Sequence, residues 1–142
     1  MKLNMIILLL TTLLVGCGGG PSTFIQKYEP TWVSVEIRDD LSTEQAWKEV
    51  VDIVAKQFEL EIISKDGLYL RTPWIYTWAK KGKLTENYRV RLIIKFSANG
   101  RRIDIRADAE KFDGEKWIVG YDKRLLETVK TDIMGVVGRV TK

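Results

Sequence analysis

The Asn99-Gly100 pair, with alternating apolar and charged residues on both sides, restricts the possible folds of this chain more than any other feature. Asn-Gly is a preferred two-residue turn of a β-hairpin, because both positions require positive φ. Pairing the flanking residues outward from this turn gathers apolar side chains on one face. The predicted apolar partners are Phe96 with Ile103, Ile94 with Ile105, Leu92 with Ala107 and Val90 with Ala109.

The other face of the same hairpin is charged. Opposite charges directly across an antiparallel pair stabilise it, and only Ile93, opposite Arg106, interrupts this face. A shift of one residue would destroy both patterns, so the register is well specified. The predicted ion pairs are Lys95–Asp104, Arg91–Asp108 and Arg89–Glu110.

Two amphipathic helices accompany the hairpin. Ser42 is a good N-cap, and Gln45 three residues later completes a capping box. Asp122 can cap a last helix, whose broad apolar stripe runs from Leu125 to Val140. The apolar stripe of the first helix consists of Trp47, Val50, Val51, Val54 and Phe58.

The remaining strands complete an α+β pattern. They are expected over residues 32–38, 60–64, 68–71 and 74–78, with a short apolar piece at 117–119 after an Asp113-Gly114 turn. Pro73 suggests an edge position or a bulge. The order β-α-β-β-β-β-α predicts a two-layer sandwich, with an antiparallel sheet of about four to five strands and both helices on one face.

The first sixteen residues have the three parts of a secretory signal peptide. Lys2 supplies a positive start, Met5 to Val15 is apolar apart from two threonines, and Gly16 is a small residue at the expected cut. The apolar run is about half the roughly 20 residues that a membrane span needs. The alternative, a helix buried in a cytosolic domain, fits poorly because the run has no polar face.

Leu14-Val15-Gly16-Cys17 resembles the lipobox of bacterial lipoproteins. The resemblance implies that Cys17 becomes the mature N-terminus and carries diacylglycerol, with a further acyl chain such as palmitate on its amine in many bacteria. Two or three acyl chains hold a protein firmly on a membrane. Since Cys17 is the only cysteine, the competing interpretation is a secreted protein with one free thiol.

These features divide the chain into a signal peptide at residues 1–16, a lipidated N-terminus and tether at 17–31, and a single α+β domain at 32–142. Glycines and prolines favour a flexible tether. Phe24, Ile25 and Tyr28 would be unnecessary in a spacer, so we expect them to dock onto the domain or onto a partner.

The charge balance is mild. The chain has 23 basic and 19 acidic residues, so loss of Lys2 with the signal peptide leaves a net charge of +3. Because basic residues alternate with acidic ones, a solvated surface is the main interpretation, and a weak attraction to anionic lipid headgroups is the second. Nucleic-acid binding would need a clustered basic face, so no nucleic-acid partner is expected.

The residue types argue against an enzyme. The chain has no histidine, and its sole cysteine is expected to be acylated, so Ser-His and Cys-His sites and zinc sites built on these residues are excluded. Asp39 with Asp40, or Asp104 with Asp108, could supply a carboxylate pair. Helix capping and cross-strand ion pairs account for them better. No cofactor and no metal are expected.

The candidate binding surface is an aromatic cluster. Trp74, Tyr76 and Trp78 are expected to share one face of their strand, with Tyr69 and Arg71 nearby. One interpretation makes them a wall of the core under the helices. The other makes them a platform on the open sheet face or rim for a partner or lipid. Pro73 prevents the alternation of side chains from deciding.

The segments Thr43 to Val50 and Phe58 to Arg71 resemble the repeated domain of BamC-like outer-membrane lipoproteins. There, too, an Ala-Trp near a helix start precedes a strand, an acidic-Gly turn and another strand. The resemblance implies a helix-grip α+β domain in an accessory of the machinery that assembles outer-membrane proteins. This chain departs from the family in having room for one such domain and a short tether.

We therefore expect a membrane-anchored, non-catalytic interaction module of the cell envelope with a protein partner. The alternative is a carrier of a lipid or small apolar ligand, held between the sheet and the last helix, and a third is a purely structural envelope protein. Gly18, where an aspartate would favour retention at the inner membrane, favours the periplasmic side of the outer membrane.

Overall fold

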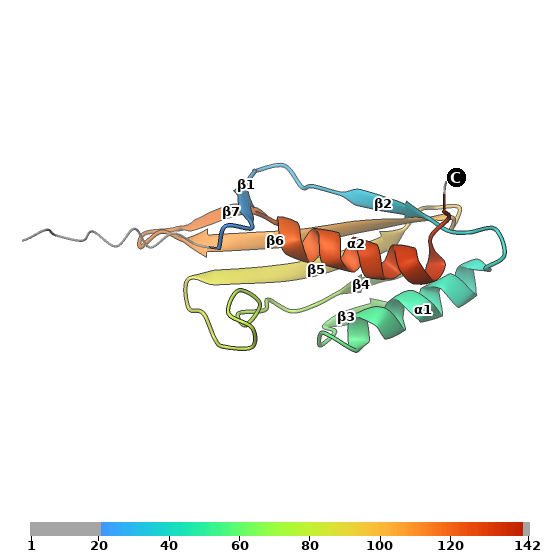
Figure 1. Ribbon diagram of the computed structural model, residues 1–142, viewed down its shortest axis with the longest axis horizontal. Coiled ribbons are helices and arrows are strands. Elements are labelled where there is room, and N and C mark those ends of the chain that lie inside the picture. Colours follow the sequence, from blue (N-terminus) through green and yellow to red (C-terminus); the bar gives the residue numbers. More distant parts are fainter. Residues whose placement is uncertain (1–20, 141–142) are drawn as a thin grey trace, which may run out of the picture.

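The computed structural model describes residues 21–140, which form two helices and a seven-stranded sheet (Figure 1). The expected signal peptide and Cys17 lie outside the described residues. No helix within residues 21–140 is long and apolar enough to cross a membrane. The elements are β1 (Phe24–Gln26), β2 (Val33–Glu36), α1 (Thr43–Ala55), β3 (Ile62–Ser64), β4 (Tyr69–Arg71), β5 (Tyr88–Phe96), β6 (Arg102–Phe112), β7 (Trp117–Asp122) and α2 (Lys123–Val137).

The sheet is open and antiparallel, with the order β1-β7-β6-β5-β4-β3. The long strand β6 pairs with β5 along one side. Along its other side it pairs with β2 near its start and with β7 near its end. The α+β class with an antiparallel sheet is therefore confirmed. The sheet has more strands than the four to five predicted, because β1 and the full length of β7 add to it.

Every pair of opposing residues predicted for the β5–β6 hairpin is confirmed, including Ile93 opposite Arg106. The predicted two-residue turn is wrong: Gly100 has a positive φ and Asn99 does not, and the Gly100 N–H bonds to the Ser97 carbonyl at 2.9 Å. Two of the three predicted ion pairs form, Arg89–Glu110 at 2.5 Å and Arg91–Asp108 at 3.4 Å. The third is wrong. Asp104 instead accepts hydrogen bonds from two nitrogens of Arg102, at 2.8 and 3.1 Å, because two forked donors reach a carboxylate better than one ammonium.

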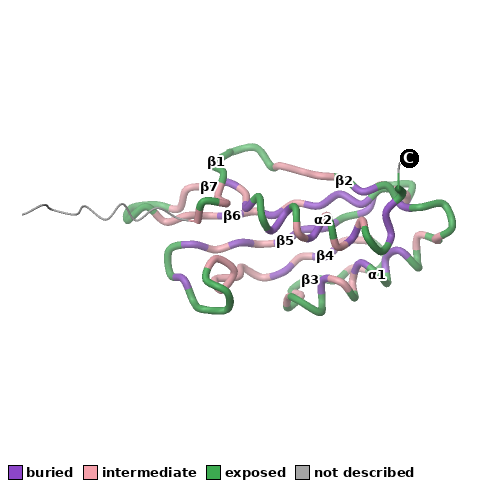
Figure 2. Tube along the Cα trace, in the orientation of Figure 1, coloured by how far each residue is buried: buried purple, intermediate pink, exposed green. Residues whose placement is uncertain are grey.

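Both helices pack on the apolar face of the sheet, and the side chains between them are buried (Figure 2). The predicted capping box of α1 is present, since Ser42 and Gln45 bond to each other's backbone N–H. The ring of Trp47 packs edge-on against Phe96 with centroids 5.6 Å apart. The core side chains of α2 are Leu125, Leu126, Val129, Ile133 and Val137.

The expected tether contains a strand. β1 pairs with β7, and Phe24 packs edge-on against Tyr88 at 6.0 Å. The buried carboxylate of Asp122, which caps α2, accepts hydrogen bonds from the hydroxyls of Tyr88 at 2.5 Å and Thr23 at 3.0 Å. Burial and this carboxylate raise the pKa of Tyr88. The ordered fold therefore begins before residue 32, and Phe24 docks onto the domain.

Candidate binding surface

The chain between β4 and β5 leaves regular strand geometry at Thr72 and Pro73. Thr72 uses its backbone N–H to donate to the Leu92 carbonyl and its hydroxyl oxygen to accept from the Leu92 N–H, both at 3.0 Å. Within residues 74–78, the one backbone pairing with β5 is that of Ile75, which exchanges both hydrogen bonds with Val90. The strand predicted over residues 74–78 is therefore wrong, because a hydroxyl and a proline replace part of the ladder.

Trp74, Tyr76 and Trp78 do not share one face, which corrects a second prediction. Tyr76 accepts a hydrogen bond from Arg89 at 3.0 Å, and Trp74 stacks on the same guanidinium at 4.6 Å, so both lie on the open face of the sheet. The ring of Trp78 instead packs beside Phe58, the residue three positions after the end of α1, at 6.0 Å. A turn after Tyr76, closed by the Gly82 N–H on the Thr77 carbonyl, reverses the chain.

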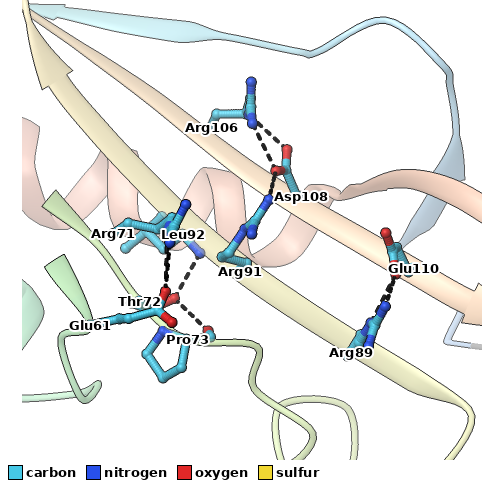
Figure 3. Close-up of polar contacts among 10 residues, drawn as sticks. All are labelled: Glu61, Arg71, Thr72, Pro73, Arg89, Arg91, Leu92, Arg106, Asp108 and Glu110. Carbon is cyan, nitrogen blue, oxygen red and sulfur yellow. Dashed lines mark hydrogen bonds and ion pairs between the residues drawn. The ribbon is translucent and has the colours of Figure 1, made fainter. Parts of the chain in front are cut away.

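On the open face the aromatic rings are covered by paired cations. The guanidinium of Arg89 lies between the rings of Trp74 and Trp117, at 4.6 and 4.2 Å, and bonds to Glu110 (Figure 3). Partial burial alone would lower the pKa of Arg89, but the hydrogen bonds with Tyr76 and Glu110 raise it. Stacking on cations stabilises such rings, so these aromatic faces are occupied within the protein.

The other two predicted residues also lie on the open face, one strand farther out. Tyr69 and Arg71 are half-buried in β4, opposite Lys95 and Ile93 of β5. Arg71 forms an ion pair with Glu61 at 2.9 Å (Figure 3). Four of the five predicted residues thus lie on the charge-balanced open face. Trp74 and Tyr76 also line the hollow described next, together with Trp78.

An open pocket of about 680 Å³ lies at the edge of the sheet, between the residues after α1, the segment 73–84 and the start of α2. We call it the edge pocket. Its walls are mainly apolar and aromatic, from Phe58, Ile75, Trp78 and Leu84. Leu84 is 69% exposed. The sequence interpretation missed Phe58 and Leu84 because three separate segments build this pocket, although a lone leucine in a lysine-rich loop was a usable signal.

Two cations, Arg124 and Lys81, line the edge pocket, and two further lysines lie in the adjoining loop. The guanidinium of Arg124 lies 4.4 Å from the ring of Trp78 and donates to the Trp78 carbonyl at 3.0 Å. Lys80, Lys81 and Lys83 are exposed, and within residues 21–140 none of the three forms an ion pair. The pocket therefore joins apolar walls to a positive rim.

The edge pocket also presents unpaired backbone. Ile75 directs both its N–H and its carbonyl to Val90. Neighbouring residues of extended backbone direct these groups to opposite sides, so we expect the N–H and carbonyl of Trp74 to face away from β5. Neither group bonds to another residue in the described part of the chain. An extended segment laid along this edge could satisfy both groups.

The carboxylate pairs have structural partners. Asp39 and Asp40 pair with Arg139 and Arg38, and Asp108 pairs with Arg91 and Arg106 (Figure 3). In the described residues no cluster of three or more acidic, histidine or cysteine side chains is arranged to hold a metal ion.

A smaller polar cavity of about 190 Å³ lies on the open face beside residues 27–31. The Nε of Arg91 and the hydroxyl of Thr31 are buried there without a hydrogen-bond partner. Cations and carboxylates balance in its lining, and it is large enough for ordered water.

None of the protein-family models compared with this chain matches it, and neither does any curated protein. The likeness to BamC-like domains therefore stays a prediction.

Proposed function

We propose that this protein is a membrane-anchored interaction module of the cell envelope, which binds an extended apolar segment of a partner protein in the edge pocket. One observation carries the proposal: an open, aromatic pocket lies beside the unpaired backbone edge at Trp74. Strand addition supplies affinity through backbone hydrogen bonds, and a neighbouring pocket supplies specificity through a side chain.

The shape of the core supports this function over a carrier with its ligand between the sheet and α2. Leu125, Val129 and Ile133 of α2 are buried against the apolar face of the sheet, together with Ile105 and Ala107 of β6. The edge pocket lies instead at the rim of the domain. Its volume suits a bulky side chain with its flanking backbone, and pockets of this volume are typical of binding sites.

The partner's chemistry follows from the rim. Arg124 and Lys81 line the pocket, whereas Glu59 is the acidic residue in the lining. A segment with an apolar or aromatic side chain and acidic neighbours would complement both the walls and the charge. A protein of the outer-membrane assembly machinery, which the BamC-like resemblance suggests, is the partner that we propose to test first.

The pocket is tested by photo-crosslinking in cells that express the full chain. A photoreactive amino acid at Glu59, in the pocket lining, should capture one defined envelope protein, and mass spectrometry should map the adduct to an extended segment of it. The matched control places the same group at Lys48, which is exposed on the outer side of α1, and should capture nothing specific.

A second variant ties the adduct to the pocket. Leu84→Asp puts a carboxylate into an apolar wall at an exposed position, so the adduct at Glu59 should disappear while the melting temperature stays unchanged. Equal capture from Glu59 and Lys48, or capture that Leu84→Asp leaves intact, would reject this function.

The membrane anchor is tested separately, by intact mass of the protein extracted from membranes. The expected mature N-terminus is Cys17 carrying diacylglycerol, with or without a further acyl chain. An unmodified Cys17, or a chain that still begins at Met1, would remove the anchoring part of the proposal.

A further inference from the structure

The loop beside the edge pocket has the composition of a membrane-surface contact. Lys80, Lys81 and Lys83 are exposed together with Leu84, and the three lysines have no acidic partner in the described residues. At the opposite end of the sheet Arg38 and Arg102 form ion pairs with Asp40 and Asp104. Three unpaired lysines therefore lie within four positions of one loop, next to an exposed leucine.

Strand β1, near the first residues that the structure describes, lies at the same end of the molecule as this loop (Figure 1). The start of α2 connects the two: the N–H of Lys123 donates to the Thr23 carbonyl at 2.9 Å, and Arg124 donates to the Trp78 carbonyl at 3.0 Å. Consecutive residues of one helix thus hold both the N-terminal segment and the base of the loop.

Few residues separate the described domain from the proposed anchor at Cys17, and this orients the domain relative to the membrane. Cys17 precedes Pro21 by four positions, and four residues span at most about 14 Å. If Cys17 is acylated, as the proposed function has it, the described domain cannot move far from the bilayer. The end that carries Thr23 is the end nearest the lipid.

We propose that the loop of Lys80 to Leu84 lies against an anionic leaflet, with the lysines at the phosphate groups and Leu84 in the interface. This inference rests on the anchoring in the proposed function and deepens it, because it gives the domain a fixed orientation. Each lysine near an anionic surface increases partitioning about fivefold. This is weak alone but effective when an acyl anchor already holds the loop close. The edge pocket, which shares Lys81 and Leu84, would then open beside the membrane.

The test uses the lipidated protein, purified from membranes and reconstituted into vesicles. An environment-sensitive fluorophore is attached at Leu84→Cys, since an acylated Cys17 does not react. The matched control carries it at Ala98→Cys, an exposed position in the β5–β6 turn, about 30 Å from the start of β5 at the usual rise of a strand.

In vesicles that contain phosphatidylglycerol, the label at Leu84 should shift to the blue and be quenched by nitroxide lipids, whereas the label at Ala98 should not. The shift should be absent in pure phosphatidylcholine. Replacing the three lysines by glutamine should weaken the contact on the order of a hundred-fold and abolish the shift. Equal signals at the two positions, or a shift independent of anionic lipid and of the lysines, would overturn the inference.

The mass of the same preparation separates the two proposals. An intact acyl anchor with no shift at Leu84 would reject the oriented loop and leave the anchor and the pocket standing. An unacylated Cys17 would reject the anchor and, with it, this orientation.

Discussion

The β5–β6 hairpin and the segment from Thr72 to Leu84 lie along the same part of the sheet, yet they are held in different ways. The hairpin is stabilised by neighbours in sequence: a Gly100 turn at φ +70°, apolar residues opposite apolar residues, and charges opposite charges. The segment is held by distant groups, namely Leu92, Val90 and Arg124.

This difference explains where the binding features lie. A ladder in which every backbone group is paired offers nothing to a partner. A segment whose backbone bonds to β5 at Thr72 and Ile75 leaves other backbone groups and a hollow beside it. The regular hairpin positions the site, and the irregular segment provides it. Four substitutions test this division between the two regions.

The largest expected effect is at the centre of the hairpin. Ile105→Ala removes a fully buried side chain, so the free energy of unfolding should fall by about 2–5 kcal/mol. Urea denaturation measures this change. Ile63→Ala is the matched control, because Ile63 is 55% exposed on the edge strand β3, and it should cost under about 0.5 kcal/mol. Similar losses for the two variants would contradict the description of the core.

The next effect is at the junction of the two regions. Thr72→Val keeps the shape of the side chain but removes the hydroxyl that accepts a hydrogen bond from the buried Leu92 N–H. The free energy of unfolding should therefore fall by about 1–3 kcal/mol. Thr72→Ser retains the hydroxyl and should recover most of that loss. If valine is tolerated as well as serine, the hydroxyl does not hold the segment to β5.

A smaller effect, with a characteristic pH dependence, is expected at Asp104 on the charged face of the hairpin. The hydrogen bonds from Arg102, together with that from Ser34, hold the pKa of Asp104 below its usual value. A lowered folded-state pKa contributes stability that is complete above the unfolded-state pKa and is lost as pH falls through the folded-state pKa.

Asp104→Asn should therefore destabilise by about 1 kcal/mol at pH 7, and the difference from the unmodified protein should shrink as the pH falls below about 4. Melting curves at several pH values measure it. Asp66→Asn, at an exposed turn, should show no such trend. A difference that stays constant down to pH 2 would show that the charge of Asp104 is not involved.

The smallest effect on stability is expected in the segment itself. Leu84→Ala changes a side chain that is 69% exposed, so stability should change by less than about 0.5 kcal/mol. Capture of a partner from Glu59 should nevertheless weaken, because Leu84 is part of the pocket wall. A clear loss of melting temperature would mean that Leu84 belongs to the core rather than to a binding surface.

The predictions from sequence succeeded where the interacting residues are close together in the chain and failed where another group competes for the hydrogen bonds. The hairpin register, the capping box at Ser42 and the cap at Asp122 are all confirmed, since each depends on residues close together in the chain. The strand over 74–78 and the ion pair of Lys95 with Asp104 were wrong. In both places a competing group, the hydroxyl of Thr72 or the guanidinium of Arg102, took the hydrogen bonds.

The candidate site shows the same division. Trp78 was among the residues predicted, but its neighbours in the edge pocket, Phe58 and Arg124, lie 20 and 46 positions away along the chain. No local pattern relates them. Trp74 and Tyr76 line the pocket as well, while they contact Arg89 on the open face. Tyr69 and Arg71 belong to the charge-balanced open face alone.

The amino-acid sequence by itself determined the α+β class, the paired faces of the hairpin and the helix starts, because alternation, turn chemistry and capping act over a few residues. Only the tertiary structure decided that β1 completes the sheet, that Trp74 and Trp78 lie on opposite sides, and that a pocket forms at the sheet edge. These features depend on which of several distant side chains contacts a given partner in the folded protein. That competition is settled by packing in three dimensions rather than by spacing along the chain.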